Sequence, residues 1–280
     1  MNVMSIHTRV VMLPTLDVLL LGTAGASSDE SFARSTDGQV KKLLEAIADA
    51  ERKFVKTLDS KFKDSVLRGP NREVDVEKYL QDFDQEKKRI DDRFGDKYSA
   101  SAEVGDLLTR ASTMHSYVRQ HPQMKGASEW DEVAENLSRL AIDYGVTFPL
   151  AAGAAARRIG DRELMESIEA VGKLPGSLQK TLQKAAKGTP TMTSVSATGS
   201  ADLEALSASL KTLKSRLSSD KPATAEARQV IVVGDRIDAL LHKAGVPGSV
   251  VAAWQSANGY LDTIAHAFGI QRTGVATPAA

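Results

Sequence analysis

One segment occurs twice in the chain, and this repeat constrains the fold more than any other feature. The sequences WDEVAENLSRLAIDYGV at 130–146 and WQSANGYLDTIAHAFGI at 254–270 align without a gap at an offset of 124. Identical or similar residues fall at i, i+3, i+7, i+10, i+11 and i+14, which is one face of an α-helix. A glycine and an apolar residue follow, the pattern of a left-handed C-cap. The repeat therefore predicts a duplicated helical module in which each copy is the closing helix.

Apolar residues recur every three or four positions in the rest of the first half, which predicts three further helices. They span about 39–66, 76–94 and 101–120, and Gly/Pro or His-Pro segments end the first and the third. Ser128 is placed to cap the fourth, closing helix. Residues 27–38 are rich in Ser, Asp and Thr, and we expect them to be loose. Short connections between four helices favour an up-down-up-down bundle.

The second half follows the same plan with a different composition. Its first predicted helix, 164–182, contains Pro175-Gly176, which should kink or break it. Residues 188–200, GTPTMTSVSATGS, are predicted to be a flexible loop, and helices are predicted at 203–217 and from 224. The start of the latter, Thr-Ala-Glu, matches Ser-Ala-Glu at 101–103 at an offset of 123. The first helices of the two halves align less cleanly, which predicts insertions there.

We therefore expect an all-α protein of two tandem four-helix modules that arose by internal duplication. The predicted organisation is a signal peptide at 1–26, a first module at 27–149, a diverged second module at 150–270 and a disordered tail at 271–280.

The first 26 residues have the pattern of an export signal. Arg9 precedes a mostly apolar run at 10–21, and Ala24-Gly25-Ala26 matches the small-x-small cleavage pattern. Asp17 interrupts the apolar run, which is also shorter than the ~20 residues of a membrane span. We expect a periplasmic or secreted protein; the alternative is a protein anchored in the membrane by an uncleaved signal.

Composition excludes several classes of function. The chain contains 0 Cys, which excludes disulfides, thiolate metal sites and thiol catalysis, and agrees with export to an oxidising compartment. Its formal net charge is +0, which argues against a nucleic-acid partner and against global attraction to anionic membranes. Membrane contact is therefore expected only if the N-terminal apolar segment stays uncleaved. A local charged patch remains compatible with this balance.

The sequence contains no recognisable catalytic or metal-binding pattern. No pair of histidines, or of histidine and glutamate, has the spacing that places two metal ligands on one helix face. Nucleophile elbows and phosphate-binding loops are also missing. We therefore predict no catalytic residue, no metal ligand and no cofactor. The weak candidates for binding an apolar ligand or non-covalent haem are Met114, His115, Tyr117 and Trp130.

These observations favour a non-enzymatic interaction or scaffold protein of the cell envelope, with a protein as its partner. Trp130 and Trp254 are then core anchors whose indole N–H groups find acceptors. The first alternative is a periplasmic binding protein that holds an apolar ligand or haem between helices. The second is an enzyme whose site is assembled from separate helices. The sequence leaves the partner and the oligomeric state open.

Overall fold

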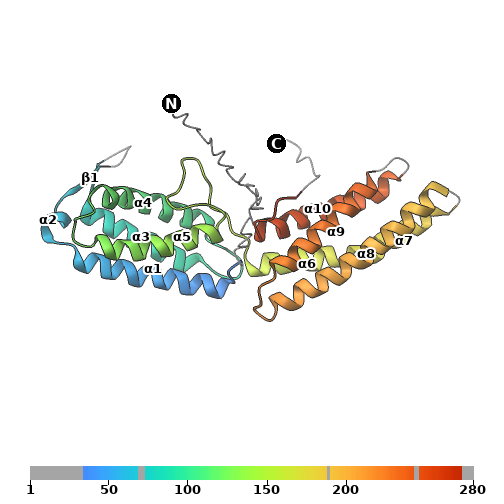
Figure 1. The fold of residues 1–280 in the computed structure, drawn as a ribbon, viewed down its shortest axis with the longest axis horizontal. Coiled ribbons are helices and arrows are strands. Elements are labelled where there is room, and N and C mark those ends of the chain that lie inside the picture. Colours follow the sequence, from blue (N-terminus) through green and yellow to red (C-terminus); the bar gives the residue numbers. More distant parts are fainter. Residues whose placement is uncertain (1–33, 69–72, 188–189, 243–245, 273–280) are drawn as a thin grey trace, which may run out of the picture. The chain divides into compact units, whose positions relative to one another are not determined.

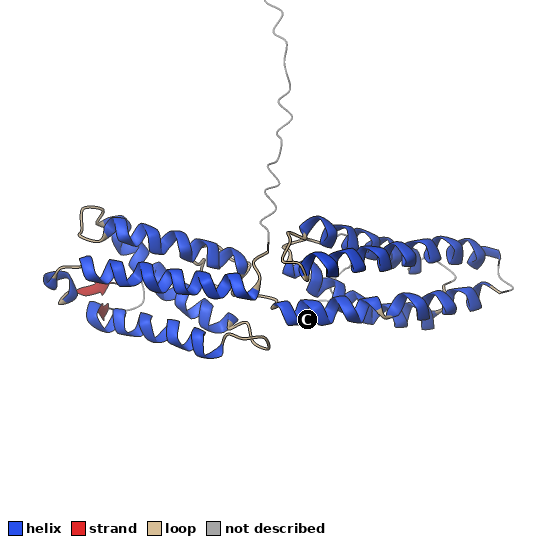
Figure 2. Cartoon of the chain, turned by 90° about the horizontal axis from the view of Figure 1, so that it is seen from below, coloured by secondary structure: helices blue, strands red, loops and turns tan. Residues whose placement is uncertain are grey.

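The computed structural model describes residues 34–68, 73–187, 190–242 and 246–272. These residues are mostly helical, and the two short strands form one antiparallel hairpin, β1 (Val66–Arg68) with β2 (Glu73–Asp75) (Figure 2). The all-α prediction is therefore confirmed. The predicted signal peptide and all but the first two residues of the predicted tail lie outside the described residues. Among the described helices, none is long and apolar enough to cross a bilayer.

Four long helices of the first half surround one hydrophobic core (Figure 1). Each packs against the next one along the chain, and the last returns to the first, so the contacts form a closed ring. Phe54, Phe83, Trp130 and Tyr144 are among its largest fully buried side chains. The helices are α1 (Asp37–Thr57), α3 (Val76–Arg93), α4 (Ser101–Gln120) and α5 (Ala127–Asp143).

The first helix is shorter than the sequence predicted. It ends at Thr57 instead of near residue 66, because Leu58 adopts an extended conformation with ψ of 132°. The side chain of Asp59 then accepts the backbone N–H of Phe62 and caps the one-turn helix α2 (Ser60–Lys63). Leu58 remains buried, at 5 % exposure, so the apolar periodicity continues across the break. The end of the helix therefore cannot be recognised from the periodicity alone.

Five helices of the second half surround a second hydrophobic core. Here the predicted first helix is divided in two, and Pro175 lies in the first turn of the second piece. The predicted break is thus confirmed. The helices are α6 (Asp161–Gly172), α7 (Leu174–Ala186), α8 (Pro190–Leu217), α9 (Thr224–Leu241) and α10 (Gly248–Ala267).

The predicted flexible loop at 188–200 is wrong for most of its length, since helix α8 begins at Pro190. Small side chains let this part of α8 approach its neighbours closely. A Cβ on Gly199 would lie 3.0 Å from Cδ1 of Leu182 and 3.3 Å from Cδ2 of Leu240. Met192 and Ser196 are buried on the same helix. Packing therefore overrides the low helix propensity of the Ser/Thr-rich sequence.

Both closing helices end as predicted. Gly145 and Gly269 have φ of 69° and 61°, in the left-handed region. The residue after each glycine donates its N–H to a carbonyl five residues earlier, the bond of a Schellman cap. The start of the first closing helix differs from the prediction, since Gly126 occupies the N-cap position instead of Ser128.

The buried face of α1 recurs along α6 and α7 at the offset of 124. No insertion is needed along this stretch, contrary to the prediction from the sequence. The matching buried pairs are Val40/Leu164, Leu44/Ile168, Ile47/Val171, Phe54/Leu178 and Leu58/Leu182.

Candidate functional site

Two of the four candidate ligand-binding residues lie together. His115, half-buried on α4, accepts a hydrogen bond at its Nδ1 from Nε1 of Trp130 on α5, at 3.3 Å. The imidazole also lies against Phe148, with ring centroids 5.3 Å apart. Burial lowers the pKa of His115, and the positive charge of Arg119 lowers it further. The imidazole is thus favoured in its neutral form, in which Nδ1 is the acceptor.

The other two candidates have different surroundings. Met114 is fully buried in the first core. Tyr117 lies between two other aromatic rings, with its centroid 5.3 Å from that of Phe62 and 4.2 Å from that of His121. Among the four candidate residues Met114, His115, Tyr117 and Trp130, a hydrogen bond joins His115 to Trp130. That the four residues line one ligand cavity stays a prediction.

Trp254 is held in the same manner as Trp130. Its Nε1 donates to Oδ1 of Asp238 at 3.1 Å, and Nδ2 of Asn258 donates to the same oxygen at 2.6 Å. Asp238 is buried at 7 % exposure, and it occupies the position of His115 at the offset of 123. Each tryptophan is therefore a buried residue whose indole N–H has a side-chain acceptor on the preceding helix.

Arg272 extends the hydrogen-bonded cluster around Asp238 and Trp254. It belongs to the folded structure, although it falls in the predicted tail. Its Nε donates to Oδ1 of Asp235 at 2.9 Å, and Nη1 donates to Oδ1 of Asp262 at 2.7 Å. Its Nη2 also donates to Oδ1 of Asn258 at 3.1 Å. With 5 % of its side chain exposed, Arg272 fastens the segment after α10 to α9 and α10.

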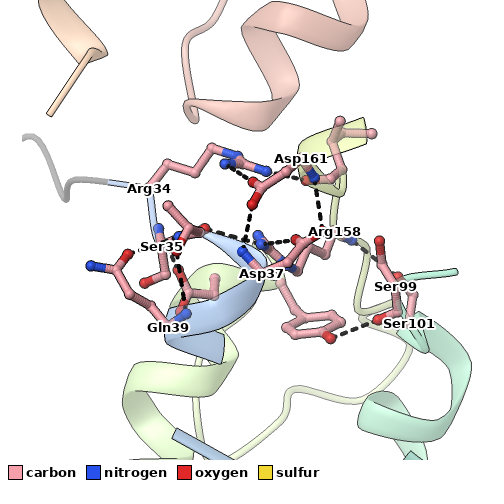
Figure 3. A network of polar contacts seen from close by, with 12 residues as sticks. Arg34, Ser35, Asp37, Gln39, Ser99, Ser101, Arg158 and Asp161 are labelled. Atoms are coloured by element: carbon pink, nitrogen blue, oxygen red, sulfur yellow. Dashed lines mark hydrogen bonds and ion pairs between the residues drawn. The ribbon is translucent and has the colours of Figure 1, made fainter. Parts of the chain in front are cut away.

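A separate polar cluster joins the segments at the starts of α1 and α6 (Figure 3). Nη1 of Arg34 lies 2.6 Å from Oδ1 of Asp161, and Nη2 donates to the carbonyl of Ile159 at 2.8 Å. Nη2 of Arg158 donates to Oδ1 of Asp37 at 2.5 Å and to the carbonyl of Ser35 at 3.0 Å. We call Arg34, Asp37, Arg158 and Asp161 the junction network.

The contacts of the junction network are reciprocal. Arg34 and Arg158, Ser35 and Ile159, and Asp37 and Asp161 are all separated by 124 residues, the offset of the repeated helices. Each arginine therefore binds the aspartate and the carbonyl that correspond to those bound by the other arginine. In addition, each aspartate accepts the backbone N–H of the other. The two halves thus meet through equivalent residues that exchange equivalent bonds.

Burial and helix geometry both favour the pairing of the two arginines with the two aspartates. Only 1 % of the Arg158 side chain and 6 % of the Arg34 side chain are exposed. Each aspartate is the first residue of its helix, where the helix dipole favours a negative charge. Burial lowers the pKa of Arg34, and the nearby charge of Arg158 adds to this effect. The guanidinium groups remain charged, so both need their carboxylate partners.

Neighbouring residues fix the junction network to α4 and α5. The backbone N–H of Arg158 donates to Oγ of Ser101 at 3.1 Å, and that of Ser35 donates to Oδ1 of Asp143 at 3.2 Å. The hydroxyl of Tyr144 donates to the carbonyl of Ser99 at 2.6 Å, beside the network. Burial raises the pKa of Tyr144, which keeps this hydroxyl a donor.

The sequence does not predict the junction network. Composition indicates a loose segment at 27–38, whereas residues 34–38 are ordered by these contacts, and the residues around Gly160 carry no obvious motif. One signal is present in the sequence: an Arg-x-x-Asp motif occurs at 34–37 and again at 158–161. Only the offset of 124 makes this short motif informative.

Metal ligands and known relatives give no further indication of function. Among the described residues, no group of three or more His, Asp or Glu side chains is placed to hold a metal ion. No family model, curated protein or solved structure matches the chain. The proposed function therefore rests on the molecule itself.

Proposed function

We propose that this chain is an exported, non-enzymatic interaction or scaffold protein of the cell envelope. In this proposal its two halves, at 27–149 and 150–270, arose by internal duplication of a four-helix module, whose first helix is divided into α6 and α7 in the second half. The common offset of the tryptophans, the buried face of the first helix and the junction network supports the duplication. The export signal pattern at 1–26 supports the compartment.

The reciprocal junction network carries the proposal. A flexible tether between modules needs no buried charges, and burying two arginines is costly unless both are paired. In this chain the charges are paired across the boundary between the two halves. Such an arrangement resists separation of the halves, and a scaffold needs this resistance in order to hold two binding surfaces in a constant relation.

The two tryptophans support the same conclusion. Both are almost fully buried, and both use the indole N–H within the protein. Hydrogen-bonded tryptophans of this kind contribute packing energy to a module and keep its surface shape constant. They therefore fit a protein that acts through its surface.

A crosslinking experiment in the source organism tests the proposal. Proteins captured by the wild-type chain would be compared with those captured by a chain in which Arg34 and Arg158 are both changed to alanine. We expect a defined protein partner whose capture needs the intact junction, while circular dichroism shows that the variant is still helical. Equal capture by both chains would contradict the role of the junction.

A second measurement separates this proposal from ligand binding. Native mass spectrometry and absorbance spectra would be recorded on protein purified from the source organism. A stoichiometric lipid, or a Soret band from haem, would replace the scaffold proposal with the binding-protein alternative. We expect a mass equal to that of the polypeptide and a spectrum of its aromatic residues alone.

A further inference from the structure

The charge on the surface of helix α7 differs from that on the rest of the protein. Four lysines and no acidic or arginine residue lie between Glu169 and Asp202. Among the described helices longer than one turn, α7 alone carries basic residues without an acidic one. These lysines, which are all exposed, are Lys173, Lys180, Lys184 and Lys187.

Three of the lysines form a line on the exposed side of α7. Leu178 and Leu182 fill the opposite side and are buried in the second core. Lys180 and Lys184 lie four residues apart on α7, and Lys187 follows three residues later as the C-cap residue, so the three share one side over ~10 Å. Lys173 stands apart from them, because its charge acts on Glu169.

The three aligned lysines make no ion pair with a described residue, whereas four lysines on other helices do. Lys53, Lys78, Lys87 and Lys214 all bind a carboxylate. The exposed residues of the adjacent segment of α8, including Ala197 and Thr198, are uncharged. The acidic residue next to this face is Glu204, whose Oε1 accepts a hydrogen bond from Nε2 of Gln179 at 3.5 Å, and it forms no ion pair with the three lysines. The positive charge on this face is therefore only partly balanced.

We propose that this face of α7 binds an anionic lipid surface. Two observations favour a membrane over a protein partner. All the basic residues are lysines, which are depleted at protein interfaces, where arginine is enriched. An ammonium also acts as a point charge without the planar fork that grips single carboxylates, so it suits a diffuse layer of phosphate headgroups. The inference goes beyond the proposed scaffold function and does not depend on it.

The apolar side of α7 already lies in the core, so the contact is electrostatic and shallow. Each lysine near an anionic bilayer strengthens binding about fivefold, and three give about 100-fold over a neutral bilayer. Salt screens such a contact, since the Debye length falls from ~10 Å at 0.1 M to ~3 Å at 1 M. Binding is therefore reversible and supplements any other membrane contact.

The test uses the full chain and sedimented vesicles of phosphatidylcholine, pure or with about one-third phosphatidylglycerol, in low salt. The change from neutral to anionic vesicles isolates the electrostatic part of binding. We expect the wild type to gain about 100-fold on anionic vesicles, and Lys180→Gln with Lys184→Gln and Lys187→Gln to abolish most of that gain. High salt should abolish it as well.

The matched control removes the same charge from α1. Lys41, Lys42 and Lys56 are exposed on a helix whose exposed residues also include Glu45 and Asp49, so their change to glutamine should leave vesicle binding nearly unaltered. Equal losses in both variants, or no gain of the wild type on anionic vesicles, would overturn the proposal. So would lysine-dependent binding to soluble polyglutamate without binding to vesicles, since that result identifies an acidic polypeptide as the partner.

A second measurement holds even if the triple variant is unstable. The chain has 0 Cys, so a single environment-sensitive fluorophore can be attached to Lys184→Cys or, as a control, to Lys56→Cys. Anionic vesicles should shift the emission of the label on α7 alone. Equal shifts at both positions, or no shift for the label on α7, would contradict the proposed face.

Discussion

Asp37 and Asp161 cap each other's helices. Oδ2 of Asp161 accepts the backbone N–H of Asp37 at 2.7 Å, and Oδ2 of Asp37 accepts the backbone N–H of Asp161 at 3.1 Å. Each carboxylate also binds the arginine that precedes the other helix. The first backbone N–H of each helix is therefore satisfied by the other half of the chain.

Arg158→Ala should lower the free energy of unfolding by about 3 kcal/mol, since it leaves the carboxylate of Asp37 unpaired and largely buried. Only 15 % of the Asp37 side chain is exposed, whereas 41 % of Asp161 is exposed. Arg34→Ala should therefore cost less, about 1–2 kcal/mol, because more of the Asp161 side chain is exposed to water. Urea denaturation of both variants measures the difference.

Arg162→Ala is the control for these two variants. Its side chain is half-exposed and pairs with Glu166 four residues along α6. Such a surface pair contributes about 0.5 kcal/mol or less. Equal costs for Arg158→Ala and Arg162→Ala would show that the junction network does not stabilise the fold.

Asp238 should tolerate asparagine better than alanine. Alanine leaves the N–H groups of Trp254 and Asn258 without their acceptor, at a cost of about 2–4 kcal/mol. Asparagine keeps one carbonyl oxygen at that position, so its cost should be about half as large. Thermal denaturation followed by tryptophan fluorescence compares the variants. If alanine cost no more than asparagine, the acceptor role of Asp238 would be excluded.

Protonation of His115 should lower the free energy of unfolding at mildly acidic pH. Its pKa is lower in the folded state than the ordinary value, so the unfolded chain binds the proton more tightly. This contribution to stability is complete above pH ~6.5 and is lost as the pH falls below that value. His266 acts in the same direction, because burial also lowers its pKa.

His115→Gln isolates this effect, since glutamine offers Trp130 an acceptor that does not titrate. Denaturation at several pH values between about 7 and 5 should show a smaller loss of stability for the variant than for the wild type. Identical pH profiles would mean that the hydrogen bond from Trp130 does not depend on neutral imidazole.

Substitution of two helical glycines by alanine should change the stability of the protein in opposite directions. A Cβ on Gly234 would lie 2.7 Å from Cδ1 of Leu261, so Gly234→Ala overpacks the contact of α9 with α10 and should cost about 1–3 kcal/mol. Gly259 on α10 is exposed, and a Cβ added there would meet no atom within 4 Å, so Gly259→Ala should stabilise by about 0.5–1 kcal/mol. Calorimetry of both variants provides the check, and a stabilising Gly234→Ala would refute the close contact.

The sequence predicted helices correctly where the apolar periodicity and the helix stop signals indicate the same boundaries. The closing helices, with their tryptophans and left-handed glycines, belong to this class, as does the break at Pro175. Prediction failed where packing opposes local preference. The Ser/Thr-rich start of α8 is helical because Gly199 admits Leu182 and Leu240, which only the folded structure reveals.

The junction network was beyond sequence reasoning for another reason. An Arg-x-x-Asp motif is short and common, and its members contact residues about 120 positions away. The repeat offset could have paired Arg34 with Arg158, but it could not show that each binds the partner of the other. The acceptor of Trp254 was equally hidden, since Asp238 and His115 share a position but no chemistry.

If the junction network couples the two halves of the chain, the distance between them should be narrowly distributed. Since the chain has 0 Cys, nitroxide labels can be placed at Lys56→Cys on α1 and Lys211→Cys on α8, both exposed. Double electron–electron resonance should give a narrow distribution for this chain and a much broader one after Arg34→Ala and Arg158→Ala are added. A distribution that is equally broad with and without the two arginines would show that the junction network does not couple the two halves.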